Sequence, residues 1–285
     1  MTAAAPENSS PIGVIAGGGV MPFAVADSLK ARGHGPVLFA LKGVCDPVAI
    51  ERFRHHWITV GQYGRMTKLL RAEKCKDLIF IGTLVRPALS EIRLDWGTLR
   101  VMGRIWSAFR GGDDHLLSGV GRLFEQEGFR LLGVKDAAPD LLMPEGNVTH
   151  AAADQNALAD IARGREVLGA LSPFDIGQAV VVIDGHVVGV EGVEGTDELL
   201  RRIAELRKGG RIRAPAGHGV LVKTPKSTQD LRYDLPTVGS RTIEGAAAAG
   251  LSGVAVAAGN TIVADAQAMI EAADAAGLFV TGLRF

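Results

Sequence analysis

Short runs of apolar residues alternate with helical patterns along the first half of the chain. Residues 12–16 are apolar or glycine throughout, which is typical of a strand buried on both faces. Glycines follow at 17–19, and Pro22 then fits the first turn of a helix. The alternation continues with predicted strands at 37–41, 78–81 and 128–134, and predicted helices at 21–31 and 65–73. It indicates a Rossmann-like, doubly wound parallel sheet.

Between residues 86 and 129 the pattern becomes helical. One apolar stripe recurs at helical spacing and consists of Leu99, Met102, Ile105, Trp106 and Phe109. We favour a core-facing role for this stripe. The segment 111–114 breaks the helix, and Asp113 or Asp114 can cap the next one.

The second half has its own set of strands and helices. Strands are predicted at 179–183, 187–190, 220–222, 254–256 and 279–280, and helices at 154–168, 196–208, 243–249 and 265–276. The dipeptide Asp184-Gly185 between two strand-like runs predicts a hairpin. We therefore predict a second α/β domain with a mixed sheet.

A stretch rich in turn residues separates the two halves. Residues 136–150 contain two prolines and a glycine and form the predicted linker. The predicted organisation is a disordered tail at 1–11, a Rossmann-like domain at 12–135, this linker, and a C-terminal α/β catalytic domain at 151–285. The tail lacks the basic and apolar regions of a signal peptide.

Composition narrows the classes of function. The 285 residues include 31 basic and 31 acidic ones, so no global field attracts nucleic acid, and only 5% are aromatic. No apolar run reaches the roughly 18 residues of a membrane span. Cys45 and Cys75 lie far apart, without a CxxC motif, and fit buried thiols in a reducing compartment. We therefore expect a cytoplasmic protein with no nucleic-acid partner.

The densest polar chemistry follows the predicted strand at 220–222. The charged and amide residues of this segment are Lys223, Lys226, Gln229, Asp230, Arg232 and Asp234, and Pro236 and Gly239 close it. Cations there could bind phosphate oxygens, and carboxylates could bind a metal or take a proton from water. A solvated charged loop is the alternative interpretation.

The glycines at 17–19 form a second candidate site. A glycine turn between a strand and a helix can bring phosphate to backbone N–H groups at the helix N-terminus. The dinucleotide fingerprint is incomplete, however, because Pro22 stands where its third glycine belongs. A tight strand-to-helix turn without a ligand explains the same residues equally well.

Two acidic clusters complete the candidate chemistry. Asp113 and Asp114 could bind Mg²⁺, although capping a helix is the favoured explanation. Glu191 and Glu194 leave a buried strand and could contact a metal or substrate. Nearby, Thr196 or Asp197 is expected to be an N-cap.

Taken together and in order, these motifs resemble a known family. They are Ile15-Ala-Gly-Gly-Gly19, Gly112-Asp-Asp-His-Leu-Leu117, Asp175-Ile-Gly-Gln178, Glu191-Gly-Val-Glu-Gly-Thr-Asp197 and the run from Lys226 to Gly239. The chain resembles, over nearly its whole length, the UDP-2,3-diacylglucosamine pyrophosphatases of lipid A biosynthesis. The type is LpxI, which is unrelated to the calcineurin-like phosphoesterases.

The resemblance implies a Mg²⁺-dependent hydrolase. Such an enzyme splits UDP-2,3-diacylglucosamine into 2,3-diacylglucosamine 1-phosphate (lipid X) and UMP, with the substrate held between two domains. Asp230 matches the essential acidic residue of the family. Because the substrate is a lipid, we also expect peripheral contact with the cytoplasmic face of the inner membrane. A homodimer is a further expectation.

These arguments give three groups of predicted site residues. The catalytic group is Asp230, Lys226 and Gln229. The substrate-binding group is Gly17, Gly18, Gly19, Asp114, Gln178, Lys223, Arg232, Thr237 and Gly239. The metal-binding group is Asp230, Asp234, Glu191 and Glu194.

Other interpretations stay open at this point. The glycine turn could serve a nucleotide-cofactor oxidoreductase, against which Pro22 counts. The protein could also bind a nucleotide sugar or an acylated sugar without catalysis. If the hydrolase interpretation is right, the apolar stripe at 99–109 is an alternative candidate for the groove that holds the acyl chains. The sequence does not decide whether Asp230 is a general base or a metal ligand.

Overall fold

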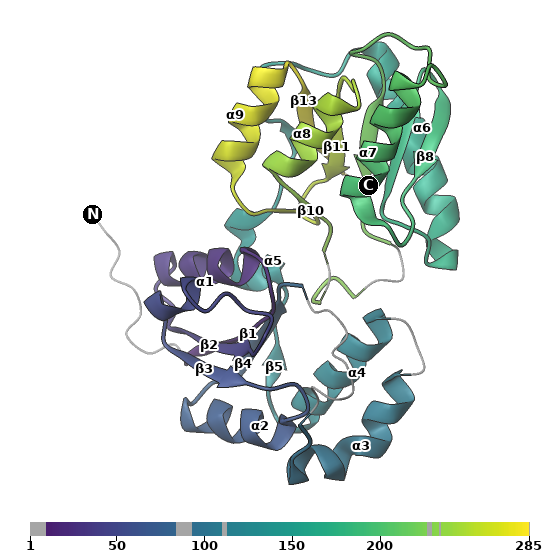
Figure 1. The fold of residues 1–285 in the computed structure, drawn as a ribbon. Coiled ribbons are helices and arrows are strands. Elements are labelled where there is room, and N and C mark those ends of the chain that lie inside the picture. Colours follow the sequence, from purple (N-terminus) through teal and green to yellow (C-terminus); the bar gives the residue numbers. More distant parts are fainter. Residues whose placement is uncertain (1–9, 84–92, 110–112, 227–229, 234, 285) are drawn as a thin grey trace, which may run out of the picture. The chain divides into compact units, whose positions relative to one another are not determined.

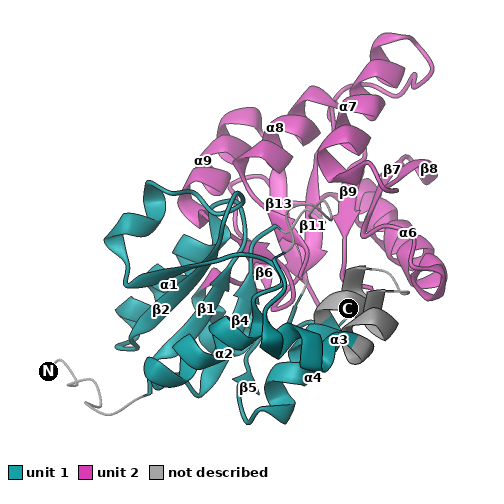
Figure 2. Cartoon of the chain, turned by 60° about the horizontal axis from the view of Figure 1, so that its bottom comes forward, with its two compact units in different colours: residues 1–140, 230–234 teal, residues 141–229, 235–285 magenta. Residues whose placement is uncertain are grey.

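The computed structural model describes residues 10–83, 93–109, 113–226, 230–233 and 235–284, with only the backbone described at 103–109 and 113–117. Contacts divide the chain into two compact units (Figure 2). Unit 1 comprises residues 1–140 and 230–234, and unit 2 comprises 141–229 and 235–285. The chain thus changes unit inside the segment predicted as the linker. The segment 230–234, which we assigned by sequence to the C-terminal domain, makes its contacts with unit 1.

A five-stranded parallel sheet forms the centre of unit 1 (Figure 1). Its strands are β1 (Ile12–Ala16), β2 (Pro36–Leu41), β3 (His55–Ile58), β4 (Asp77–Ile81) and β5 (Arg130–Leu131). The order β3-β2-β1-β4-β5 is that of a Rossmann-like sheet, which confirms the predicted fold class of the first half. β1 is buried along its whole length because helices cover both faces of a parallel sheet.

Helices cover the two faces of this sheet. They are α1 (Met21–Ala31), α2 (Tyr63–Ala72), α3 (Trp96–Phe109), α4 (Asp113–Gln126) and α5 (Val134–Ala137), with short 3₁₀ turns η1 (Ala49–Arg52) and η3 (Pro139–Leu141). α2 and α4 bury apolar side chains against the sheet in one cluster that includes Phe39, Leu70 and Phe124. α1 packs with α5 and lies on the other face of the sheet in Figure 1.

Unit 2 contains a six-stranded mixed sheet. Its strands, in spatial order, are β6 (Gly146–Asn147), β13 (Phe279–Leu283), β11 (Gly253–Ala257), β9 (Val220–Lys223), β7 (Ala179–Ile183) and β8 (His186–Val190). The central pairs β13–β11 and β11–β9 are parallel, whereas β7 is antiparallel to both of its neighbours. The turn between β7 and β8 is Asp184-Gly185, with both residues at positive φ, which confirms the predicted hairpin.

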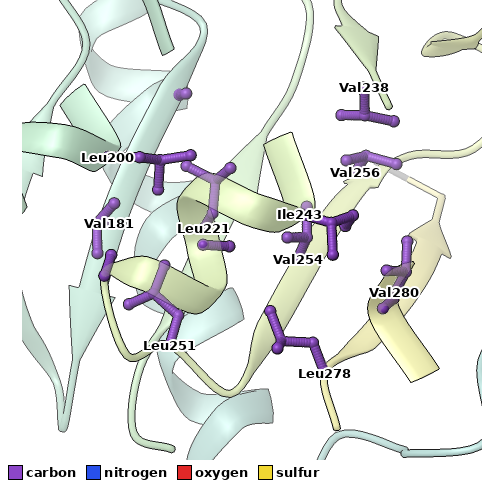
Figure 3. Packing of buried hydrophobic residues seen from close by; sticks show 14 of the residues in the cluster. Val181, Leu200, Leu221, Val238, Ile243, Leu251, Val254, Val256, Leu278 and Val280 are labelled. Carbon is purple, nitrogen blue, oxygen red and sulfur yellow. The ribbon is translucent and has the colours of Figure 1, made fainter. Parts of the chain in front are cut away.

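Two apolar layers enclose this sheet. The helices of unit 2 are α6 (Gln155–Leu171), α7 (Gly195–Lys208), α8 (Ser240–Ala248) and α9 (Ala266–Ala276), with the 3₁₀ turn η4 (Ser172–Phe174). α6 packs on one face, against Val180 and Val222 among others. α7, α8 and α9 bury side chains against the opposite face, where Val181, Leu221 and Val254 lie (Figure 3). A small parallel pair, β10 (Thr237–Val238) and β12 (Ile262–Val263), follows the carboxyl end of β9.

Several local predictions differ from the structure. The strand predicted at 128–134 is reduced to β5, because helix α5 begins at Val134. β3, of sequence His-His-Trp-Ile, was not predicted, since an edge strand that is only half-buried lacks a continuous apolar run. The stripe at 99–109 lies on a helix as predicted, but Leu99 is exposed rather than in the core. Its members from 103 onwards lie outside the described side chains.

The two cysteines match their prediction. Cys45 and Cys75 are both buried and free. Burial raises the pKa of the Cys75 thiol to about 12. Across the residues that the structure describes, no helix is both long and apolar enough to cross a membrane.

Candidate functional site

A buried lysine lies at the carboxyl end of β9 in unit 2. Lys223 is only 8% exposed. Its Nζ donates hydrogen bonds to Thr196 Oγ1 at 2.9 Å and to the Thr237 carbonyl at 3.1 Å. Ligands of open α/β sheets bind beyond the carboxyl ends of the strands, so this is where a substrate phosphate would be expected. The contacts hold the ammonium group in one place, near α7 and β10.

A carboxylate holds the Thr196 hydroxyl that contacts Lys223. Glu191 follows β8, and its Oε1 accepts a hydrogen bond from Thr196 Oγ1 at 2.7 Å. Its Oε2 accepts the backbone N–H of Gln178 at 2.7 Å. One hydroxyl therefore donates to Glu191 and accepts from Lys223, linking two predicted site residues. We call Gln178, Glu191, Thr196, Lys223 and Thr237 the Lys223 cluster.

The backbone fits closely around this cluster. Gly177 has φ +55°, and a Cβ at that position would lie 2.1 Å from the Glu191 carbonyl oxygen. Only glycine allows the two loops to approach so closely. The loop before β7 therefore packs directly against the backbone of Glu191.

The start of α7 differs from the prediction, and Glu194 does not contact the Lys223 cluster through its ion pair. We expected Thr196 or Asp197 to be the N-cap of a helix, but α7 begins at Gly195 after the N-cap Glu194 and has no side-chain cap. Thr196 is thus free to serve the cluster. Glu194 instead pairs with Arg202 at 3.2 Å.

A second lysine of unit 2 lies next to the Gln178 loop. Lys226 Nζ forms an ion pair of 2.5 Å with Asp175 Oδ1. The lysine side chain is largely buried, whereas the aspartate is exposed. Asp175 adopts a left-handed backbone conformation, with φ +58°, immediately before the loop that carries Gln178. The predicted catalytic Lys226 and the Lys223 cluster therefore lie on connected loops of one unit.

Asp230 belongs to a separate cluster in unit 1. Arg232 donates to both carboxylate oxygens of Asp230, with Nε–Oδ1 at 3.0 Å and Nη2–Oδ2 at 2.8 Å. Glu125 of α4 accepts from Arg232 Nη1 at 2.8 Å. The hydrogen bonds from Arg232 lower the pKa of Asp230, although burial opposes them. We call Glu125, Asp230, Arg232 and Tyr233 the Asp230 cluster.

Tyr233 anchors this cluster to unit 1. Its ring packs edge-on against Phe80 at 5.9 Å, and its hydroxyl lies where a Cβ on Gly121 would be, 1.9 Å away. Burial raises the pKa of the phenol to about 12, and among the described residues the hydroxyl has no hydrogen-bond partner. The absence of a side chain on Gly121 thus allows the segment to pack on α4.

The glycine turn of unit 1 has a structural explanation. Gly17 and Gly18 donate their N–H groups to the carbonyls of Ile81 and Thr83, at 2.9 and 2.8 Å. A Cβ on Gly17 would lie 2.6 Å from the Thr83 carbonyl, so the chains touch backbone to backbone. Gly19 has φ +83° and open space around it, which leaves it the best placed of the three glycines to meet a ligand.

Not every predicted residue can be placed. Gln229 and Asp234 lie outside the described residues, and the side chain of Asp114 does as well. Gly239 is the N-cap of α8, in an extended conformation that any residue adopts. Among the described residues, no three His, Cys, Asp or Glu side chains are grouped as metal ligands. Both oxygens of Glu191 accept hydrogen bonds within the protein, so its observed role is to orient Thr196.

Sequence reasoning missed Thr196, Glu125 and Tyr233 as members of these clusters. Thr196 lies within the motif from Glu191 to Asp197, so its position was marked but its partner could not be read. Glu125 lies 107 residues from Arg232 in an ordinary helical pattern, and nothing in the sequence connects the two.

Comparison with known proteins agrees with the motifs. The sequence profile of the LpxI N-terminal domain matches residues 11–141, and that of the LpxI C-terminal domain matches 144–281. The UDP-2,3-diacylglucosamine pyrophosphatase LpxI of Caulobacter vibrioides is 39% identical over 272 residues, which cover 95% of this chain and 97% of that protein. The structure of glycinamide-RNase-transformylase T from Mycobacterium tuberculosis matches 63% of this chain and 43% of its own, at 14% identity. Its TM-score of 0.24 is too low to support an argument. Since the two profiles cover nearly all of the chain, this protein belongs to the LpxI family.

Proposed function

We propose that this protein hydrolyses the pyrophosphate bond of UDP-2,3-diacylglucosamine. The products are 2,3-diacylglucosamine 1-phosphate (lipid X) and UMP, and water supplies the atoms added across the broken phosphoanhydride bond. The observation that carries the proposal is the 39% identity to the Caulobacter enzyme along 95% of this chain. Because the match extends through both units, it includes the segments that form both clusters.

The chemistry of a pyrophosphate diester suits the lysines of unit 2. The diester is a dianion at neutral pH, and its cleavage requires neutralisation of charge on the phosphate oxygens. Lys223 offers an ammonium group that Thr196 and Thr237 hold in place. Lys226 offers a second ammonium group, and a substrate phosphate would replace the exposed Asp175 as its ion-pair partner. We assign both lysines to the pyrophosphate, and Gln229, three residues after Lys226 in the sequence, remains a proposed catalytic residue.

We propose Mg²⁺ as the cofactor, bound chiefly through Asp230. Magnesium is usually held by one or two carboxylates together with substrate phosphates and water, so a cage of three protein carboxylates is not required. The ion pair with Arg232 maintains Asp230 as a carboxylate, which suits a metal ligand better than a general base. Asp234 remains the proposed second carboxylate. When bound, the metal would supply positive charge to the phosphate oxygens.

Arg232 then has a positioning role toward Asp230. Its guanidinium contacts Asp230 on one side and Glu125 on the other, so the carboxylate is held in one orientation. The proposal keeps the expectation that one substrate molecule contacts both units. A homodimer also stays a proposal, which sedimentation of the purified protein would test.

Measurement of UMP release from UDP-2,3-diacylglucosamine tests the function. The purified protein with Mg²⁺ should release UMP, and chelation of the metal should abolish the reaction. Asp230→Ala should lower the rate by about 100-fold or more while the protein still folds. Asp27→Ala removes a comparable surface aspartate, paired with Arg52 in unit 1, and should leave the rate unchanged.

Two outcomes would contradict the assignment. An Asp230→Ala variant with normal activity would remove Asp230 from the site. Tight binding of the substrate by the unaltered protein without release of UMP, with Mg²⁺ or any other divalent metal, would instead favour a non-catalytic binding protein.

A further inference from the structure

An exposed apolar and basic surface surrounds the start of α3 in unit 1. Trp96 is 81% exposed, Leu94 49% and Leu99 46%. Three exposed arginines accompany them: Arg65, Arg93 and Arg100. We call these six residues the α3 surface. None of them belongs to the Lys223 cluster or the Asp230 cluster.

The structure fixes which face of α3 points outward. Asp95 accepts the N–H groups of Gly64, Arg65 and Thr98, at 3.1, 2.8 and 2.8 Å, and thus caps α2 and α3 together. Thr98 is buried and donates to the carbonyl of Gly61. Because the inward side is fixed in this way, Trp96 and Leu99 are held on the opposite side of the helix.

The three arginines all lie near the start of α3. Arg100 lies one turn after Trp96, and residues at that spacing share a helix face. Arg65 follows Gly64, whose backbone touches Gly97 so closely that a Cβ on Gly97 would lie 2.4 Å from the Gly64 Cα. Within the part of the chain that the structure describes, none of the three arginines forms an ion pair. The one acidic residue among 93–100, Asp95, directs its carboxylate at backbone N–H groups.

We propose that the α3 surface docks on anionic phospholipid membranes. Tryptophan and leucine insert at the boundary between headgroups and acyl chains, and arginines attract negatively charged headgroups. A second copy of this chain is a poorer occupant, because a two-fold contact would bring two copies of the same positively charged surface together. The charge of the surface therefore favours a lipid partner.

Docking of this kind would bring the enzyme to its substrate, an argument that rests on the proposed function. A diacylated sugar nucleotide resides in a membrane, so an enzyme held at that membrane meets a higher local concentration of substrate. The proposal gives a place on the molecule to the peripheral contact expected from the nature of the substrate. It does not require α3 to touch the substrate itself.

Flotation with vesicles that contain no substrate tests the proposal directly. The protein should bind vesicles of phosphatidylglycerol mixed with phosphatidylcholine and should bind pure phosphatidylcholine far more weakly. Arg93→Gln and Arg100→Gln should each weaken binding by about fivefold. Trp96→Ala should weaken it by roughly tenfold, and Trp96→Phe should restore most of the loss. Added salt should weaken binding by the unaltered protein.

Matched controls separate docking from folding and from catalysis. Val48→Ala changes an equally exposed apolar residue of unit 1, and Arg211→Gln an exposed arginine of unit 2; neither should alter binding. All variants should hydrolyse detergent-dispersed substrate at the rate of the unaltered protein. If that protein hydrolyses nothing yet binds vesicles, the proposed function fails and the docking surface stands.

Three results would overturn the proposal. The first is equal binding of the unaltered protein to anionic and neutral vesicles. The second is unaltered binding by Trp96→Ala and Arg100→Gln together. The third is self-association in solution that Trp96→Ala abolishes while vesicle binding is absent, because a second copy would then be the occupant.

Discussion

Lys223 and Asp230 lie only seven residues apart in sequence, yet the clusters named after them belong to different units of the protein. Lys223 is buried, and the described partners of its ammonium group are a hydroxyl and a carbonyl. Asp230 has a side chain that is 32% exposed, and its partner is the guanidinium of Arg232. One dense run of polar residues therefore contains two environments with different electrostatics.

The difference determines how each cluster should respond to mutation. Removing water from a charged group is costly, so a buried ammonium depends strongly on each hydrogen bond that it makes. A partly exposed ion pair is screened by water, and its loss costs little stability. We therefore expect small changes around Lys223 to affect the site more than changes of similar size around Arg232.

Among substitutions of the residues that hold a site group in place, replacement of Thr196 by valine should give the largest effect. Valine has the shape of threonine but cannot accept from Lys223 or donate to Glu191. An unsatisfied buried group costs about 1–3 kcal/mol, which corresponds to a loss of roughly 5- to 160-fold in kcat/KM if Lys223 binds the pyrophosphate. The rate of UMP release at varied substrate concentration gives kcat/KM for each variant.

Thr196→Ser is the matched control, because serine retains the hydroxyl. It should keep kcat/KM within a few-fold of the unaltered protein. If the valine variant loses thermal stability but keeps its kinetic constants, the cluster has a purely structural role. Arg232→Gln provides the comparison in the other unit, and a larger loss of stability there than in Thr196→Val would contradict the contrast between the clusters.

Substitution of Gly121 should disturb the anchoring of the Asp230 cluster. A Cβ at this position would lie 1.9 Å from the Tyr233 hydroxyl, so Gly121→Ala must displace the ring or the helix. Overpacking of this kind usually costs about 1–3 kcal/mol, and the loss should appear in denaturant unfolding. Activity should fall with it, because Tyr233 lies three residues from Asp230.

Gly169→Ala is the control for Gly121→Ala. Gly169 lies in α6 with open space where an added Cβ would lie, so alanine should stabilise that helix by up to about 1 kcal/mol. Equal stability of the two variants would show that Tyr233 does not pack on α4 as described.

The fold of both units followed from local patterns, and the division of the site did not. Buried strands such as Ile12–Ala16 and Ala179–Ile183 are continuous apolar runs, and the hairpin at Asp184-Gly185 carries its own turn chemistry. Such signals lie within a few residues of one another. The attachment of Asp230 to unit 1 depends instead on Glu125 and Gly121, more than 100 residues earlier in the chain.

Sequence reasoning has the same limit at the two carboxylates of unit 2 that we predicted as metal ligands. Glu191 and Glu194 leave a buried strand, a position that indicates either ligand binding or local hydrogen bonding. Their partners, Thr196 and Arg202, both lie on α7, six residues apart, and the sequence does not show which way each side chain turns. Spacing can therefore mark a cluster of functional residues without assigning the role of each.

Acid should weaken the Asp230 cluster in a defined direction. Hydrogen bonds from Arg232 lower the pKa of Asp230 below its ordinary value of about 3.9. At a pH near that ordinary value, the carboxylate is therefore still ionised in the folded protein but begins to protonate in the unfolded chain. The stability that the pair contributes is fully present above that ordinary pKa and is lost as the pH falls through the lower pKa of the folded state. The stability difference between the unaltered protein and Arg232→Gln should accordingly be constant from pH 7 to about pH 5 and shrink below about pH 4. Unfolding by urea at each pH measures this stability difference. Arg232→Lys is the control, because it keeps the positive charge and loses the bidentate hydrogen bonds of the guanidinium. A difference that grows on acidification would mean that Arg232 is not the partner that keeps Asp230 ionised.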